Sequence, residues 1–320
     1  MSATTKKIIF ILSAIALLLL PFLLEDFRVF QVNLVLIYAI AILGLNILTG
    51  YGGQISLGHG AFYAVGAYTS AILISQLGMS SYLTIPIAGV VCLVMGVLMG
   101  FPALRLAGHY LALATFALAI ATPQLLKYKA IEHWTGGVQG IVLEKPTPPF
   151  KLVLFGNDLS EDRWLYFVIL AIALSLFWMA HNLLSGRVGR AIMAIRDQPT
   201  AAAALGVNLT IVKTATFGLS AAYTGVAGAL SALAVAYIAP DSFPAFLSIS
   251  LLVGVVVGGL GSISGAIFGA LFIQFVPNVA DEISKSAPWA VYGAMLLALA
   301  YAAPNGVMGI LKTIRKRKQA

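Results

Sequence analysis

The polar side chains best placed to do chemistry lie in a glycine-rich stretch, GYGGQISLGHG, at residues 50–60. Gln54, Ser56 and His59 offer neutral hydrogen-bond donors and acceptors at the edge of an apolar run, where glycine turns also expose backbone groups. Two interpretations are open. These residues contact a polar solute on a path through the protein, or Ser56 only caps the end of a helix at an interface.

A second glycine-rich stretch, GGLGSISGAIFGA at residues 258–270, follows a similar pattern. Paired glycines precede Ser262 by three residues, as they precede Ser56, and a Gly-Ala pair follows in both stretches. Corresponding glycine interruptions in two halves of a chain can mark a solute path. The alternative is close helix packing without a functional role.

A third stretch, HWTGGVQGI at residues 133–141, contains Thr135, Gly136 and Gly137. Adjacent glycines favour a turn with free N–H groups. Such a turn binds a substrate carboxylate, binds a partner loop, or is only a turn.

Other kinds of chemistry have no support in the sequence. His109, His133 and His181 are isolated, and no cysteine or carboxylate cluster accompanies them, so no metal site is predicted. No Gly-Lys pair occurs, so a phosphate-binding P-loop is absent and the chain is expected to bind no cofactor. No nucleophile or paired-carboxylate pattern predicts catalytic residues, and the net charge of +8 is not arranged as a nucleic-acid groove.

The composition predicts an all-α polytopic membrane protein, with residues 1–320 as one transmembrane domain. The chain is 60% hydrophobic and 9% charged, whereas soluble domains carry about 25% charged residues. Runs of about 20 apolar residues match a bilayer core of about 30 Å. Ten transmembrane or re-entrant spans are expected, at about 8–24, 32–50, 57–76, 82–101, 106–126, 164–184, 212–236, 246–257, 265–276 and 289–303. The short eighth and ninth spans either cross fully or re-enter.

The distribution of basic residues predicts the orientation. With the N-terminus inside, both termini are cytoplasmic, residues 127–163 form an external loop and residues 304–320 form a basic cytoplasmic tail. Of the 11 acidic residues, only Asp197 then lies on the cytoplasmic side. Inside are twelve of the 19 Lys and Arg residues: Lys6, Lys7, Arg105, Arg187, Arg190, Arg196, Lys213, Lys312, Arg315, Lys316, Arg317 and Lys318.

The longest basic interruption is SGRVGRAIMAIRDQPTAAAALGVNLTIVK, residues 185–213. Its cations are accompanied only by Asp197, so an amphipathic, mostly helical segment on the cytoplasmic surface is expected. Another protein is expected to dock there. The alternative is that the arginines only enforce topology.

No Asp, Glu, Lys or Arg lies in the middle of an expected span. Ion-coupled carriers usually place ionisable groups at that depth, and charge-selective channels need charged rings or a carbonyl filter. The energy for any transport is therefore expected to come from another chain.

Several motifs in order resemble the permease subunits of branched-chain amino acid ABC transporters, the LivM type in particular. They are residues 186–230 (GRVGRAIMAIRDQPTAAAALGVNLTIVKTATFGLSAAYTGVAGAL), GYGGQISLGHGAF, WTGGVQGI and GGLGSISGAIFGA. The resemblance covers about Asn33 to Gly309. It implies an ABC importer permease architecture in the bacterial inner membrane.

The resemblance also implies partners and a coupling surface. The partners are a second homologous permease forming a heterodimer, two cytoplasmic ATPase subunits that carry ATP and magnesium, and a periplasmic solute-binding protein that delivers leucine, isoleucine or valine. The family's coupling pattern falls on Arg187, Gly189, Arg190, Ala194, Ile195, Arg196, Ala201, Ala202, Gly206 and Asn208, with Asp197 in the same segment. The helix-prone run that ends at Gly206 is expected to act as a rigid lever. Ala203 departs from the glutamate that is common in the family, so docking is expected to depend on shape and on the arginines.

Three alternatives remain at this point. Urea or short-amide importers share the architecture, and pore residues alone do not separate their solutes. An ion-coupled carrier that works alone would need buried carboxylates. A structural membrane protein would not need glycine-interrupted spans.

Overall fold

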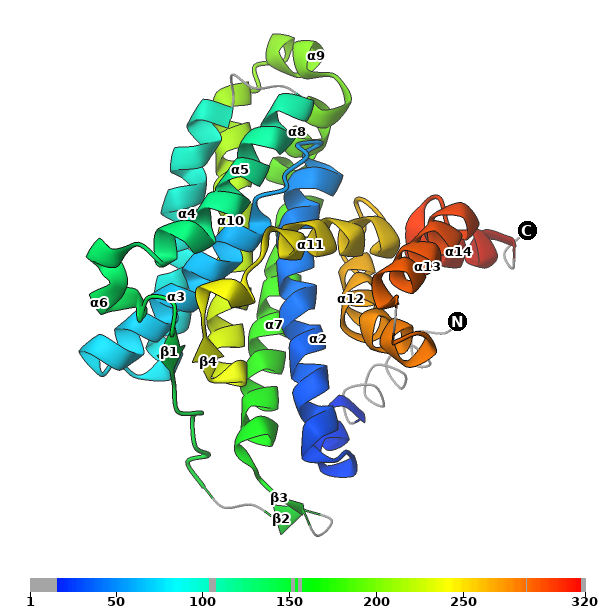
Figure 1. Cartoon of the computed structure of the whole chain (residues 1–320). Coiled ribbons are helices and arrows are strands. Elements are labelled where there is room, and N and C mark those ends of the chain that lie inside the picture. Colours follow the sequence, from blue (N-terminus) through cyan, green and yellow to red (C-terminus); the bar gives the residue numbers. More distant parts are fainter. Residues whose placement is uncertain (1–15, 104–107, 151–152, 155–156, 286, 318–320) are drawn as a thin grey trace.

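Helices form most of the structure, a computed structural model that describes residues 16–103, 108–150, 153–154, 157–285 and 287–317 (Figure 1). Within these ranges, eight helices are long and apolar enough to cross a membrane. The prediction of an all-α, multi-pass membrane protein is confirmed. The long helices are α2 (Asp26–Asn46), continued by the π-helix η1 (Ile47–Tyr51), α3 (His59–Leu77), α4 (Ser81–Ala103), α5 (His109–Leu126), α7 (Glu161–Ser185), α10 (Leu209–Val235), α11 (Ala245–Gly258) and α12 (Gly265–Ile283).

Shorter elements connect or flank these helices. They are η2 (Lys129–Ile131), α6 (Glu132–Thr135), α8 (Arg187–Asp197), α9 (Pro199–Ala204), η3 (Pro240–Ser242), α13 (Pro288–Ala302) and α14 (Gly306–Arg317). Two small antiparallel ribbons join β1 (Ile141–Val142) to β4 (Tyr237–Ile238) and β2 (Val153–Leu154) to β3 (Asn157–Asp158).

The expected spans near the C-terminus differ from the observed helices. The ninth span was expected to end at Val276, which is wrong: α12 continues to Ile283 with Pro277 inside it. Proline is tolerated in such helices because neighbouring groups satisfy the freed backbone. At 19 residues α12 is long enough to cross. α11 itself has 14 residues and lies across α2 in Figure 1, and together with η3 it gives a candidate span of 19 residues, Pro240–Gly258. The tenth span, α13, has a shorter apolar core, Ala290–Leu299.

Parts of some predictions lie outside the described residues. Of the first expected span, the structure describes the part from residue 16, and residues 16–23 are helical. The first residues of the fifth expected span also lie outside, as do Lys6, Lys7, Arg105 and Lys318.

Ion pairs agree with the predicted separation of two surfaces. Lys127 pairs with Asp241 at 2.5 Å, Lys145 with Asp162 at 2.7 Å, and Arg163 with Asp26 at 3.1 Å. Each pair joins residues that the predicted topology places on the outer side. In Figure 1, α8 and α9 lie at the end of the bundle opposite to β2 and β3. That end is the predicted cytoplasmic end, because the predicted topology places its basic residues inside.

Small residues let α10 occupy the centre of the bundle, where it packs against α2, α3 and α4. A Cβ added at Gly66 on α3 would overlap the backbone of Gly225, and one at Gly228 would overlap the Tyr63 carbonyl. On α4, a Cβ at Gly96 would lie 2.5 Å from the Ala221 Cβ. Small residues thus let these helix backbones approach closely, as is common between membrane helices.

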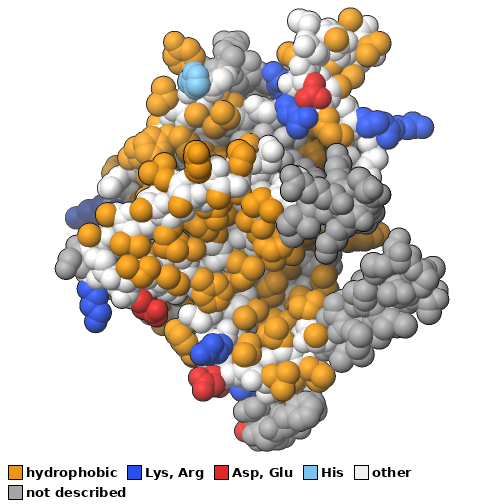
Figure 2. Space-filling view, turned by 90° about the vertical axis from the view of Figure 1, so that its right-hand side faces the viewer, with side chains coloured by type: hydrophobic (Ala, Val, Ile, Leu, Met, Phe, Trp, Pro, Cys, Tyr) orange, Lys and Arg blue, Asp and Glu red, His pale blue; other side chains and the backbone are white. Residues whose placement is uncertain are grey.

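Apolar side chains cover the broad face of the molecule in Figure 2, and most charged side chains lie toward its margins. Exposed leucines and valines on α4, such as Val90, Val94 and Leu98, belong to the same kind of surface. A bilayer is the solvent in which such a surface is stable.

The packing at Gly228 generates a prediction. Gly228→Ala should lower the melting temperature of the detergent-purified chain, because overpacking typically costs about 1–3 kcal/mol. Gly293→Ala is the matched control: Gly293 also lies in a helix, but nothing lies within 4 Å of an added Cβ. It should leave the melting temperature unchanged or raise it slightly. Equal effects of the two substitutions would contradict close α3–α10 packing.

Candidate functional site

The basic segment, residues 185–213, forms two short helices before α10 because a proline interrupts it. Pro199 has no N–H and cannot continue α8, so the chain breaks at Gln198 and restarts as α9. The segment expected to be mostly helical is therefore two short helices, α8 and α9, joined at one residue. Gly206 ends the segment in the left-handed region (φ 85°), and the Val207 N–H donates to the Ala202 carbonyl at 3.0 Å. The predicted glycine cap is confirmed.

The exposed face of α8 carries the cations. Gly189, Ile192 and Ile195 are buried, whereas Arg187, Arg190 and Asp197 are exposed. Gly189 lies so close to the Leu184 backbone that no Cβ would fit. On α9, Ala202 is buried, and Ala201 and Ala203 are exposed. The segment therefore presents a small, basic surface at the cytoplasmic end.

Arg196 connects α8 to the first glycine-rich stretch. Its Nη1 donates to the Gly50 carbonyl at 3.0 Å, while its Nε donates to Asp197 at 2.8 Å. The Arg196 stem lies against Gly53, where an added Cβ would come within 2.6 Å of the arginine Cγ. Gly53 also has φ 68°, a conformation that favours glycine. Arg196 is thus the direct polar contact between the basic segment and the break after α2.

His59 braces the centre of the bundle. It is fully buried, and its Nδ1 and Nε2 lie 3.0 Å from Ser56 Oγ and 2.7 Å from Ser220 Oγ. Ser220 Oγ donates its hydrogen to the Gly44 carbonyl at 2.6 Å, so it must accept from His59 Nε2–H. In a neutral imidazole with Nε2 protonated, Nδ1 accepts from the Ser56 hydroxyl. His59 joins α3 to α10, and through Ser220 to α2, with both ring nitrogens occupied.

Hydroxyl groups satisfy the loop that precedes α3. The Leu57 N–H donates to Thr115 Oγ1 at 2.9 Å, and the Gly60 N–H donates to Ser248 Oγ at 2.8 Å. The backbone groups expected to be free for a solute are therefore occupied here. Gly58, not Ser56, is the residue before α3, so the N-cap interpretation of Ser56 is wrong.

Gln54 does not join the His59 cluster. Its backbone N–H donates to the Leu48 carbonyl at 3.2 Å, and its carbonyl accepts from the Thr49 hydroxyl at 3.0 Å. It stays with η1, half-buried, at the cytoplasmic end of the loop.

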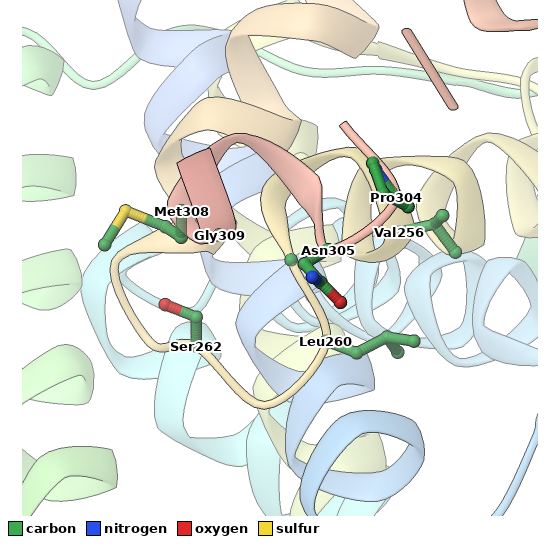
Figure 3. A pocket seen from close by; sticks show the side chains of 8 residues that line it. Val256, Leu260, Ser262, Pro304, Asn305, Met308 and Gly309 are labelled. Carbon is green, nitrogen blue, oxygen red and sulfur yellow. The ribbon is translucent and has the colours of Figure 1, made fainter. Parts of the chain in front are cut away.

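Ser262 belongs to the contact between the two glycine-rich stretches. Its carbonyl accepts from Asn46 Nδ2 at 2.8 Å, and Asn46 Oδ1 accepts from the Gly261 N–H at 2.9 Å. The Ser262 side chain lines a cavity of about 330 Å³ between this loop and α14, together with Asn305 and Met308 (Figure 3). The structure therefore brings Ser262 close to residues 46–53, as a shared solute path would require.

Thr135, Gly136 and Gly137 form a closed turn elsewhere. Thr135 Oγ1 donates to the Leu126 carbonyl at 2.8 Å and accepts from the Gly137 N–H at 3.2 Å. Gly136 and Gly137 have φ 70° and 56°, so the turn requires glycine. The turn leads through Gly140 into β1, which pairs with β4 at the predicted outer side. It is separate from the cytoplasmic cluster.

Comparison with known proteins identifies the family of the chain. The sequence pattern of the family described as branched-chain amino acid transport system / permease component matches residues 28–302. The chain belongs to this family. No solved structure matches it.

Individual relatives within this permease family have related names. The chain is 33% identical over 343 aligned residues to the high-affinity branched-chain amino acid transport system permease protein LivM of Escherichia coli K12, covering 99% of this chain and 78% of the relative. It is 25% identical to the LivH permease of Salmonella typhimurium LT2, covering 85% and 91%. It is 26% identical to the autoinducer 2 import system permease LsrC of Escherichia coli O157:H7, covering 98% and 91%.

Several residues important to this permease site were missed in the sequence. Asn46, Ser220, Ser248 and Thr115 each bond a backbone or side-chain group of a glycine-rich segment. A signal was present, since polar residues are rare inside such apolar spans, but their partners are far apart in sequence.

Arg163 was counted only as an outer charge. It is 5% exposed and donates to the Pro21, Asp158 and Leu24 carbonyls. Among the described residues, no group of three or more His, Cys, Asp or Glu could hold a metal ion.

The His59 brace generates a prediction. Ser220→Ala removes the acceptor of His59 Nε2–H and the donor to Gly44, and an unsatisfied buried polar group costs about 1–3 kcal/mol. The melting temperature of the purified chain should fall. Ser175→Ala is the control, because Ser175 is exposed and bonds only the Ala171 carbonyl of its own helix. A melting temperature as high as that of the control would show that His59 does not brace the bundle.

Proposed function

We propose that this permease forms half of the translocation pathway of an ATP-binding-cassette importer for branched-chain amino acids in a bacterial inner membrane. Its proposed partners are a second homologous permease, two cytoplasmic ATPase subunits that bind ATP and magnesium, and an external solute-binding protein. The LivM and LivH names support the solute class, since those relatives are named as branched-chain amino acid permeases.

The contact of Arg196 with Gly50 and Gly53 is the observation that supports ATP-driven coupling best. A force on the exposed face of α8 reaches the end of α2 through one charged side chain. Bonds from a charged donor are stronger than neutral ones. The guanidinium is held on its other side by Asp197. An ATPase that moves α8 would therefore move the break between α2 and α3.

The central parts of the spans contain no alternative driver. Lys213 lies in the first turns of α10, and Asp281 and Glu282 lie at the end of α12. Within the described residues, the charged groups of the eight long helices are all near helix ends. Changing a two-state pore from 1:99 to 99:1 requires about 5.5 kcal/mol of differential binding, which ATP bound between two docked ATPases is proposed to supply.

Reconstitution tests this proposal. The chain is placed in proteoliposomes with a second permease, two ATPases and a solute-binding protein from the same organism. Leucine-loaded binding protein should stimulate ATP hydrolysis and leucine uptake, and urea or autoinducer 2 should not. Uptake by this chain alone, driven by a proton gradient, would overturn the proposal.

Charge reversal on α8 gives a narrower prediction. Arg190→Glu should reduce ATP-driven uptake about tenfold or more, because a like-charge contact at a docking surface costs several kcal/mol. Arg28→Glu makes the same change on an exposed arginine at the predicted outer side and should leave uptake unchanged.

The proline substitution Gly206→Pro tests the end of the same segment. Gly206 has φ 85°, which proline cannot adopt, so uptake should be lost while membrane insertion persists. Normal uptake by either Arg190→Glu or Gly206→Pro would rule out coupling through this segment.

A further inference from the structure

Asn46 lies where three separate segments meet at the cytoplasmic end. It is 1% exposed, on the last turn of α2, directly before the π-helix η1. Its side chain reaches the loop between α11 and α12, more than two hundred residues later in the chain. Short π-helices are uncommon and often mark functional positions.

The two hydrogen bonds of Asn46 have opposite directions. The side-chain amide donates to the Ser262 carbonyl at 2.8 Å and accepts from the Gly261 N–H at 2.9 Å. The amide therefore occupies one donor and one acceptor of the loop backbone, as a neighbouring strand would. No other natural side chain of this length offers both groups.

Glycines bring the backbones together around this amide. A Cβ added at Gly50 would overlap Asn46 Oδ1 and the Gly261 nitrogen. The same Gly50 carbonyl accepts from Arg196. Gly261 has φ 70°, which a residue with a side chain would adopt only under strain. The contact thus combines polar bonds with a close approach of glycine backbones.

We propose that Asn46 is a positioning residue that clamps the two glycine-rich segments together, so that α8, the end of α2 and the start of α12 move as one unit. Arg196 transmits motion of α8 to Gly50, and Asn46 passes it to Gly261 and Ser262. Three polar bonds and close glycine contacts link these segments, so motion of one is passed to the others. This inference rests on the proposed function for its transport consequence, but the clamp itself is a structural claim.

The first test measures amide exchange in the purified chain, without partners. Asn46→Leu should speed hydrogen–deuterium exchange of the peptide containing Gly261. Asn33→Leu is the matched control: Asn33 is also buried in α2 and donates to the Asp162 carbonyl at 3.0 Å, at the outer end. It should leave that exchange unchanged. Unaltered exchange in Asn46→Leu, or equal changes in both variants, would overturn the clamp.

The second test measures solute transported per ATP hydrolysed in the reconstituted complex. Asn46→Leu should hydrolyse ATP but transport about tenfold less solute per ATP, the change that about 1.4 kcal/mol produces. Gly50→Ala keeps Asn46, but its added Cβ would push the Gly50 and Gly261 backbones apart. It should therefore reduce the solute transported per ATP by the same factor. Asn33→Leu should keep the wild-type ratio.

The outcomes separate the two proposals. If the wild-type complex does not transport, the proposed function fails while amide exchange still decides the clamp. If it transports and Asn46→Leu keeps the wild-type ratio, the positioning role is wrong and the proposed function stands.

Discussion

The structure depends on one constraint: a broken helix in a bilayer must find partners for its freed backbone groups within the protein, because lipid offers none. Within the described residues, two such breaks follow η1 and α11. Hydroxyls of Thr115 and Ser248 occupy backbone N–H groups at the first break. The Asn46 amide occupies one N–H and one carbonyl at the second. The polar residues inside the bundle are explained largely by this need.

The same solution makes the two breaks interdependent. His59 ties the start of α3 to α2 and α10, so the first break is fixed at its inner end. Arg196 and Asn46 hold its cytoplasmic end. The break is therefore fixed by His59 in the centre of the bundle. Its other end is held by hydrogen bonds to the loop before α12 and to α8, the helix on which a partner is proposed to dock. Such an arrangement favours movement of whole helices over local unfolding.

Much of the fold could be predicted from the sequence, because hydropathy and charge bias are local signals. The spans matched by α2 to α10 and the Gly206 cap were read correctly. The end of the ninth span, next to Pro277, was predicted wrongly, because whether a helix continues through a proline depends on the helices around it. The alanine run before Gly206 was also predicted to be helical, and it forms α9 after Pro199.

The candidate site was less predictable. Ser56, His59 and Ser262 stand out in the sequence as polar residues in or beside glycine-rich stretches, but their hydrogen-bond partners could not be predicted. Ser220 and Asn46 meet their partners across 161 and 216 residues of sequence. Side-chain bonds over such separations leave no periodic pattern. Only the packed structure shows that His59 is a brace and that Ser262 meets Asn46.

The central claim is that α8 and the two glycine-rich segments move together. The most direct measurement is the distance between spin labels in the reconstituted complex, in a Cys92→Ser background. One label is placed at Val188 on α8, one at Leu260 in the second loop and one at Val142 on β1, all exposed positions. On ATP binding, the Val188–Leu260 distance should stay constant while both distances to Val142 change. A change between Val188 and Leu260 with a constant distance from Leu260 to Val142 would contradict the claim.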